Sequence, residues 1–288
     1  MKIAILTSHS PYNFGANLQA YTTSEYLKSL GHKPVVIDYG RKEKTQKYRK
    51  MVPQEQWCAH DKFIEEMLPL SIGVDNNAEI KELFLMEKFD GVIVGADAVW
   101  SWPKKQKDIP VYFLDWLFST PQINHIPAAS MSVANMSAGF KHLDKGLREQ
   151  TKNAISQFRY LSVRDEWTKD VINNHLFKSK EIVQIVNPDP VFMIDQFVDV
   201  EFRRNGIISE NEKYIICTFP LQSLSIAKWF LKFREYANKR GFSVGQLPLP
   251  EGKSNLDFDF TVPYPIDPIQ WYLWLKNSSG FVGLRYHA

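Results

Sequence analysis

The first forty residues alternate between an apolar run, a polar loop and a helical repeat, and this alternation constrains the fold most. Lys2–Leu6 reads as a strand, and residues 8–15 form a turn-rich loop. Small or apolar residues then follow at helical spacing, at positions 16, 20, 23, 27 and 30. Gly31 suits the end of this helix, and residues 35–38 read as the next strand. This βαβ unit predicts a parallel sheet with helices on its faces.

The alternation continues to residue 186 and restarts after a charged stretch at residues 201–213, which predicts two domains. We expect an N-terminal domain of residues 1–198 and a C-terminal domain of residues 212–288. The second domain reads as three strands, at residues 214–219, 242–247 and 280–284. Three strands are few for such a domain, so we expect the C-terminal domain to be truncated.

Composition excludes several classes of protein. Apolar residues at 44% and charged residues at 23% are typical of a globular protein. Thirty-five Lys and Arg against 32 Asp and Glu are too balanced for a dedicated nucleic-acid binder. No apolar run approaches the roughly 18 residues of a membrane span, and the N-terminal run is too short for a signal peptide. Cys58 and Cys217 cannot form a disulfide framework, and we expect them to be buried in a reducing compartment, the cytoplasm.

The loop at residues 8–19 follows the first strand. Ligands of open α/β sheets bind outside the carboxyl ends of strands, where a helix N-terminus favours anions. The loop contains a single glycine, Gly15, so the Gly-x-Gly-x-x-Gly fingerprint of dinucleotide sites is absent. A plain strand-to-helix turn is the open alternative.

Charged residues follow other strands in the same way. Asp97 comes after the strand at residues 91–95 and is a candidate functional residue at the sheet edge. The alternative is a purely structural role, in which Asp97 caps the next helix. Arg164 can hold a carboxylate or phosphate through two hydrogen bonds, and a surface pair with a neighbouring acid is its alternative. Arg285 and His287 follow the last strand, which brings a cation and an acid/base group to one edge.

Other motifs in the sequence give weaker evidence of function. The histidines lack metal-ligand spacing, so we expect no bound metal. Asp257-Phe258-Asp259 has the Asp-x-Asp form of metal-dependent glycosyltransferases, but it lies late in the chain in an acidic, aromatic loop. Residues 41–50 contain six Lys or Arg, which is typical of a solvated loop, with peripheral contact to an anionic membrane surface as the alternative.

Taken together, these segments resemble the polysaccharide pyruvyl transferase family. The specific part is Asn13-Phe14-Gly15-Ala16-Asn17-Leu18-Gln19-Ala20-Tyr21, where family members typically show Asn-Tyr-Gly-Ala-x-Leu-Gln-Ala-Tyr. Further matches follow in family order: Gly31-His32, Val36 to Tyr39, Phe89 to Trp100, Tyr112 to Asp115, Ser162 to Asp165, Asp189-Pro190, Pro268 to Trp271 and Arg285 to His287. They extend along nearly the whole chain.

The resemblance implies two Rossmann-like domains in a GT-B-like arrangement. It also implies transfer of a pyruvyl group from phosphoenolpyruvate to a pair of sugar hydroxyls, giving a pyruvate ketal on a surface polysaccharide. Arg164 and Arg285 would bind the donor, and His287 and Asp97 would act as acid/base groups. Asn13, Gly15 and Gln19 are further substrate-binding candidates. The expected partners are phosphoenolpyruvate and a glycan or lipid-linked sugar acceptor, with no separate cofactor.

Two other functions stay open. A nucleotide-sugar-dependent GT-B glycosyltransferase would share the fold, because a fold alone does not determine function. A non-catalytic glycan-assembly protein is the second alternative. It rests on Ala96 and Ala98, which stand where the family usually has the polar residues of Gly-Ser-Asp-Gln-Val-Trp. The reaction would take place in the cytoplasm, with the inner face of the membrane as a further option.

Overall fold

The chain forms two compact units. The computed structural model describes residues 1–41, 52–102, 108–135, 140, 143–178, 181–219, 224–249 and 254–283. Unit 1 comprises Met1–Ser10, Ala16–Lys42 and Glu65–Phe197, and unit 2 comprises Pro11–Gly15, Glu43–Ile64 and Val198–Ala288. A short loop from the first domain of the sequence therefore packs within unit 2.

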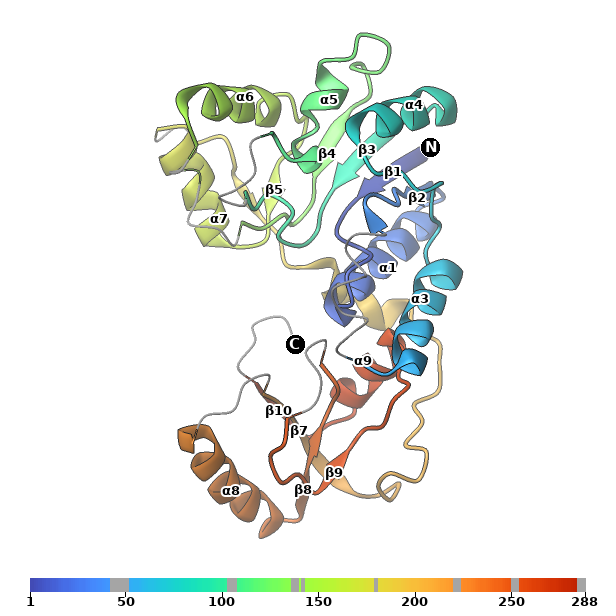
Figure 1. Ribbon diagram of the computed structural model, residues 1–288, viewed down its shortest axis with the longest axis vertical. Helices are drawn as coiled ribbons and strands as arrows, with labels where there is room; N and C mark the ends of the chain where they lie inside the picture. Colours follow the sequence, from blue (N-terminus) through green and yellow to red (C-terminus); the bar gives the residue numbers. More distant parts are fainter. Residues whose placement is uncertain are drawn as a thin grey trace. The chain divides into compact units, whose positions relative to one another are not determined.

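Unit 1 is built on a parallel sheet with the strand order β2-β1-β3-β4 (Figure 1). Its strands are β1 (Lys2–Leu6), β2 (Lys33–Val36), β3 (Gly91–Val94) and β4 (Ala128–Ser130). Isolated bridges from Ala129 and Val133 join β4 to a further parallel pair, β5 (Ser162–Val163) and β6 (Ile185–Val186). All but the first residue of β1 are buried, as expected for a parallel strand covered on both faces.

Helices connect the strands of unit 1. They are α1 (Phe14–Ser29), α4 (Asn77–Glu87), α5 (Asp115–Phe118), α6 (Lys145–Ile155) and α7 (Glu166–Asp170). Short 3₁₀ helices lie at Val111–Phe113 and Pro190–Gln196, and a π-helical segment lies at Val171–Leu176. Asn76, Asp144 and Asp165 cap α4, α6 and α7 by accepting backbone N–H groups of the first turn. The core is strongly aromatic, and Trp100 stacks on Phe113 with ring centres 5.6 Å apart.

Unit 2 contains a second parallel sheet, with the order β10-β7-β8-β9. Its strands are β7 (Lys213–Thr218), β8 (Phe242–Gln246), β9 (Phe260–Thr261) and β10 (Gly280–Gly283). Helix α8 (Leu224–Asn238) packs Phe230 against Cys217, while α9 (Pro268–Lys276) packs Trp274 against Tyr214. Because residues of opposite parity along β7 meet the two helices, α8 and α9 cover opposite faces of this sheet.

The loop at Pro11–Gly15 and most of helix α3 (Gln54–Met67) complete unit 2. Gln56 is fully buried, accepts the Ile266 N–H (2.7 Å) and donates to the Ile266 carbonyl (2.7 Å). Phe14 packs on Trp271, with ring centres 5.3 Å apart. These contacts anchor both early segments beside the start of α9.

The α/β fold class predicted from the sequence is confirmed, with local differences. Strands β4 and β9 and helix α3 were not predicted, and β9 gives unit 2 four strands in place of the expected three. Cys217 is buried, which raises the pKa of its thiol to about 12, whereas the expectation of a buried Cys58 is wrong because Cys58 is exposed on α3. Within the described residues, no helix has the length and apolar character required to cross a bilayer.

Candidate functional site at the carboxyl edge of the unit 1 sheet

The strand order of unit 1 places a topological switch point between β1 and β3. From β1 the chain crosses to β2 on one side, and from β2 it crosses back to β3 on the other side. Ligands of doubly wound α/β folds bind outside the carboxyl ends of the strands at such a point. The residues directly after β1 and β3 are therefore the first place to look for a site.

A buried hydrogen-bond network occupies this switch point. The Gln19 amide nitrogen donates to the Thr7 hydroxyl (2.8 Å) and to the Ala16 carbonyl (2.9 Å), and its amide oxygen accepts the Ala96 N–H (3.0 Å). The Thr7 hydroxyl in turn donates to the Ala96 carbonyl (3.1 Å). Gln19 thus connects the end of β1, helix α1 and the turn after β3. Its role in substrate binding stays a prediction, while its positioning role is visible in these bonds.

We expect a Gln19→Glu substitution to lower the free energy of unfolding by about 2–4 kcal/mol at neutral pH. Gln19 is 1% exposed, and a carboxylate oxygen in place of its amide nitrogen would face two acceptors that it cannot satisfy. Urea unfolding followed by circular dichroism measures the change. Gln157→Glu is the matched control, because Gln157 is exposed in the turn that follows α6. We expect Gln157→Glu to change the free energy of unfolding by no more than about 0.5 kcal/mol. Equal effects of the two substitutions would contradict the positioning role of Gln19.

The turn after β3 presents Asp97. Asp97 has a φ of 75°, its side chain accepts the Ala98 N–H (2.7 Å), and its carbonyl accepts the Ala134 N–H (2.8 Å). Residues 98–102 are not helical, so Asp97 does not cap a directly following helix. The tight turn fixes the carboxylate, whose side chain is 26% exposed, at the edge of the sheet.

Arg164 lies between two carboxylates at the same edge. One of its terminal nitrogens is 3.2 Å from an Asp189 oxygen and 3.9 Å from an Asp97 oxygen. The Arg164 backbone N–H donates to the Val133 carbonyl (2.9 Å), which ties the end of β5 to the segment after β4. Asp165 caps α7, so the pairing of Arg164 differs from the surface pair considered as its alternative. Three strand ends therefore contribute one charged cluster, made of Asp97, Arg164 and Asp189.

Burial dominates the electrostatics of this cluster. Desolvation raises the pKa of Asp189, and the Val191 N–H and the Arg164 charge only partly oppose it. The Arg164 side chain is 8% exposed, so its guanidinium is held rigidly. With both carboxyls ionised, the cluster carries a net charge of −1. Asp97 is the most exposed member of the cluster.

A second pair at this edge was missed by sequence reasoning. His9, which follows β1, is fully buried, and its Nε2 lies 3.0 Å from an oxygen of Asp38, which follows β2. Asn17 donates to the His9 carbonyl (2.6 Å), and Arg41 lies 3.8 Å from Asp38. The signal was available, because His9 lies in the loop after the first predicted strand and Asp38 is the last residue of the second. These bonds hold the start of the loop that leads to α1.

The remaining predicted site residues are placed as follows. Asn13 directly precedes α1, and Gly15 lies in its first turn, so the predicted strand–loop–helix order is present. Arg285 and His287 lie outside the described residues, as do residues 42–50 of the basic segment. The Asp257-Phe258-Asp259 motif is occupied within the protein, because Arg234 pairs with both aspartates.

Comparison with known families shows the family to which the chain belongs. The profile of a family described as polysaccharide pyruvyl transferase matches residues 13–288, nearly the whole chain. The chain belongs to this family. The polysaccharide pyruvyl transferase match contains Gln19 and Ala96 of the buried network, but not Thr7, and it contains all of the Asp97–Arg164–Asp189 cluster. A search of curated proteins found no match.

Solved structures share the fold at low identity. A protein from Listeria monocytogenes assigned as a UDP-N-acetylglucosamine 2-epimerase is 11% identical, with a TM-score of 0.53 over 99% of this chain and 75% of that one. This likeness supports the predicted class of two Rossmann-like units of the GT-B type. A UDP-N-acetylglucosamine 2-epimerase from Rickettsia bellii (12%, TM-score 0.48, 98% and 73% covered) and an α-glucosyltransferase bound to UDP (12%, 0.49, 98% and 68%) are also similar.

Proposed function

We propose that the protein transfers the pyruvyl group of phosphoenolpyruvate to a pair of hydroxyls on a sugar, forming a cyclic ketal on a surface polysaccharide. The family match over residues 13–288 carries this proposal. The acceptor is a glycan or a lipid-linked sugar. The cluster of Asp97, Arg164 and Asp189 supports the proposal, because it combines an anion-binding side chain with an accessible carboxylate.

The reaction balances without an oxidant or a reductant. A proton adds to the methylene carbon of phosphoenolpyruvate, and a first sugar hydroxyl attacks the central carbon. The bond from this carbon to the phosphate oxygen then breaks, a second hydroxyl closes the ketal, and inorganic phosphate leaves. The two hydroxyl protons end on the new methyl group and on the phosphate. The protein must therefore hold an anion and exchange protons, for which general acid–base groups contribute about 10²–10⁴-fold.

We assign these tasks to residues at the strand ends. Arg164 would hold the carboxylate or the phosphate of the donor, and Asp97 would exchange a proton with the acceptor. Because the two aspartates offset the charge of Arg164, a second cation is needed, and Arg285 is our candidate. His287 is the second acid/base candidate, since an imidazole titrates near neutral pH. Asn13 and Gly15 at the start of α1 are candidate substrate contacts.

Calorimetric titration with phosphoenolpyruvate, followed by a phosphate-release assay over a panel of glycan acceptors, tests the proposal. We expect phosphoenolpyruvate to bind and phosphate release to depend on the acceptor. Binding of UDP or a UDP-sugar without binding of phosphoenolpyruvate would overturn the proposal in favour of a nucleotide-sugar glycosyltransferase. Binding of neither class would favour a non-catalytic role in glycan assembly.

A further inference from the structure

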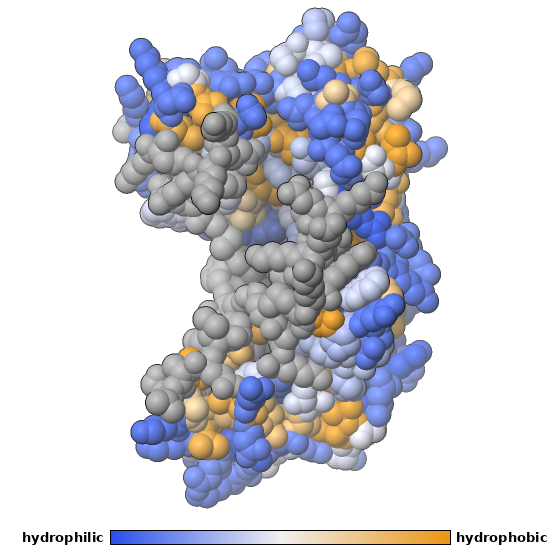
Figure 2. Space-filling view, viewed as in Figure 1, coloured by the Kyte–Doolittle hydropathy of each residue, from blue (hydrophilic) through white to orange (hydrophobic). Residues whose placement is uncertain are grey.

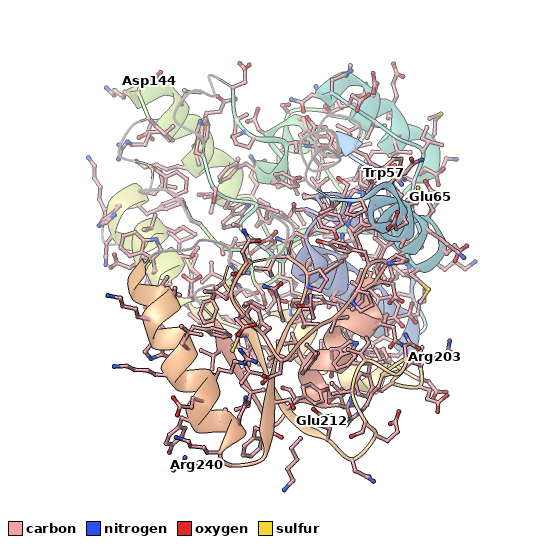
Figure 3. The ribbon with its side chains drawn as sticks, turned by 60° about the horizontal axis from the view of Figure 1, so that its bottom comes forward. Trp57, Glu65, Asp144, Arg203, Glu212 and Arg240 are labelled. Carbon is pink, nitrogen blue, oxygen red and sulfur yellow. The ribbon has the colours of Figure 1, made fainter. Side chains whose placement is uncertain are left out.

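Helix α8 of unit 2 has one face that the sheet does not use. Phe230 and Ala237 are buried against the sheet, and the partly buried Ile226 and Phe233 pack against the same hydrophobic cluster. The outward side chains extend along the helix and continue into the residues directly after it. Figure 3 shows α8 from outside, with Arg240 at its C-terminal end and nitrogen-bearing side chains projecting away from the sheet.

Basic and aromatic side chains are concentrated on this outward face. At about 100° per residue, its members fall within a sector of about 120°, over a length of about 18 Å. All are exposed, and we call them the α8 face: Lys228, Trp229, Lys232, Tyr236, Lys239 and Arg240. Trp229 is 46% exposed and Tyr236 is 56% exposed, so both rings are accessible to a partner. Figure 2 shows hydrophilic and apolar residues adjoining at this end of unit 2.

The two rings of the α8 face each pack on a neighbouring side chain. Trp229 stacks on Phe233 with ring centres 5.1 Å apart and an angle of 7° between the planes. The Arg240 guanidinium lies 3.5 Å from the centre of the Tyr236 ring. Each aromatic ring therefore packs on a neighbouring side chain, which reduces the side-chain entropy that is lost when the face meets a partner.

The charge of the α8 face is strongly positive. Its four cations adjoin one acid of α8, Glu235, which hydrogen-bonds Lys239 (2.7 Å), and this bond lowers the pKa of Glu235. Arg234 lies outside the face and pairs with Asp257 and Asp259, so these acids are already matched. The excess of positive charge thus belongs to the outward face itself.

We propose that the α8 face docks the protein peripherally on an anionic phospholipid bilayer. Trp and Tyr are suited to the boundary between headgroups and acyl chains, and surface Lys and Arg are attracted to anionic headgroups. A second copy of the chain is disfavoured, because a two-fold contact would oppose two positive faces. This inference does not depend on the donor, and it concerns a surface of unit 2 remote in sequence from the Asp97 cluster.

Vesicle co-sedimentation tests the docking surface. We expect the protein to bind phosphatidylcholine vesicles that contain about 30% phosphatidylglycerol, and not vesicles of phosphatidylcholine alone. Each basic residue contributes about fivefold to partitioning, so Lys228→Glu/Lys232→Glu should weaken binding by at least about 25-fold. Binding should also fall at about 1 M salt, where the screening length is about 3 Å.

Matched variants control for general effects of charge and exposed rings. Lys33→Glu/Lys145→Glu reverses two exposed lysines of unit 1 and should leave vesicle binding unchanged within about twofold. Trp229→Ala should weaken binding, whereas Trp167→Ala, at an indole 53% exposed on α7, should not. Equal binding to neutral and anionic vesicles would overturn the proposal, and so would equal losses in the two lysine pairs. A wild-type protein that binds no vesicle while pulling down an acidic protein would also overturn it.

Discussion

A Gly95→Ala substitution is expected to lower the free energy of unfolding by about 3–5 kcal/mol, or to abolish soluble folded protein. A Cβ at residue 95 would lie 2.1 Å from the Met131 carbonyl oxygen and 3.0 Å from a Val133 methyl group. Gly95 also has a φ of 119°, which side-chain-bearing residues rarely adopt. The obstacle is the backbone of the neighbouring strand segment, whose Met131 N–H donates to the Val94 carbonyl (2.8 Å), so it cannot move without breaking the sheet.

Gly31→Ala separates backbone strain from the steric clash. Gly31 has a φ of 78°, but a Cβ there would meet nothing within 4 Å. We expect a cost of about 1–2 kcal/mol for Gly31→Ala, with soluble protein at normal yield. Urea unfolding of both variants, with soluble yield as the second measurement, gives the comparison. A Gly95→Ala protein as stable as Gly31→Ala would show that the turn before Asp97 is not closely packed.

An Arg164→Met substitution is expected to lower kcat/KM for phosphoenolpyruvate by about 10²-fold or more, because hydrogen bonds to charged groups are worth about 1.5–3 kcal/mol each. It should also destabilise the fold, since Asp97 and Asp189 would lose their shared cation. Arg164→Lys keeps the charge but loses the planar pair of donors. We expect Arg164→Lys to restore most of the stability and little of the activity. Wild-type donor affinity in Arg164→Met would remove Arg164 from the site.

The pH dependence of stability identifies the partner of Arg164. The raised pKa of Asp189 means that the folded protein binds this proton more tightly than the unfolded chain does. Asp189 therefore contributes stability below its unfolded pKa, and this contribution is lost as the pH rises through its folded pKa. The Arg164 charge lowers the pKa of Asp189, so Arg164→Met should raise that pKa further. The destabilisation by Arg164→Met should thus be larger at pH 8 than in mild acid.

Arg148→Met is the control for this pH effect. The Arg148 guanidinium donates to the carbonyls of Phe140 (3.0 Å) and His175 (3.3 Å), and neither of these acceptors titrates. We expect Arg148→Met to destabilise the protein by a similar amount at both pH values, measured by chemical unfolding. A parallel pH dependence in the two arginine variants would contradict the coupling of Arg164 to Asp189.

Local patterns explain which parts of the fold were predictable. Strand β1 and helix α1 follow from apolar spacing over many residues, and Gly31 ends the helix with a positive φ as expected. Strand β4 has three residues and β9 has two, which is too short for any periodicity to be seen. Helix α3 directly follows the basic segment that was read as a loop. Its Gln56 is buried by contacts with residue 266, which no local pattern can indicate.

The site shows the same division. The position of Asp97 and Arg164 at strand ends could be predicted, because the carboxyl ends of parallel strands share one edge. Their common partner, Asp189, could not, since it depends on how the Asn187-Pro188-Asp189-Pro190 segment returns to the end of β5. The His9–Asp38 bond could have been predicted from the first βαβ unit, but His9 was considered only as a single histidine without metal-ligand spacing. Pairs of strand-end residues are thus more informative than single ones.

The packing of Gln56 with Ile266 has a consequence for biosynthesis. The two residues are 210 positions apart in the chain. At ribosomal rates of about 5–20 residues per second, Gln56 is synthesised about 10–40 s before its partner. During that interval the apolar side of α3, with the neighbouring Tyr12 and Phe14, lacks the later part of unit 2, residues 198–288, to cover it. We therefore expect chaperone dependence during translation to map to these early segments.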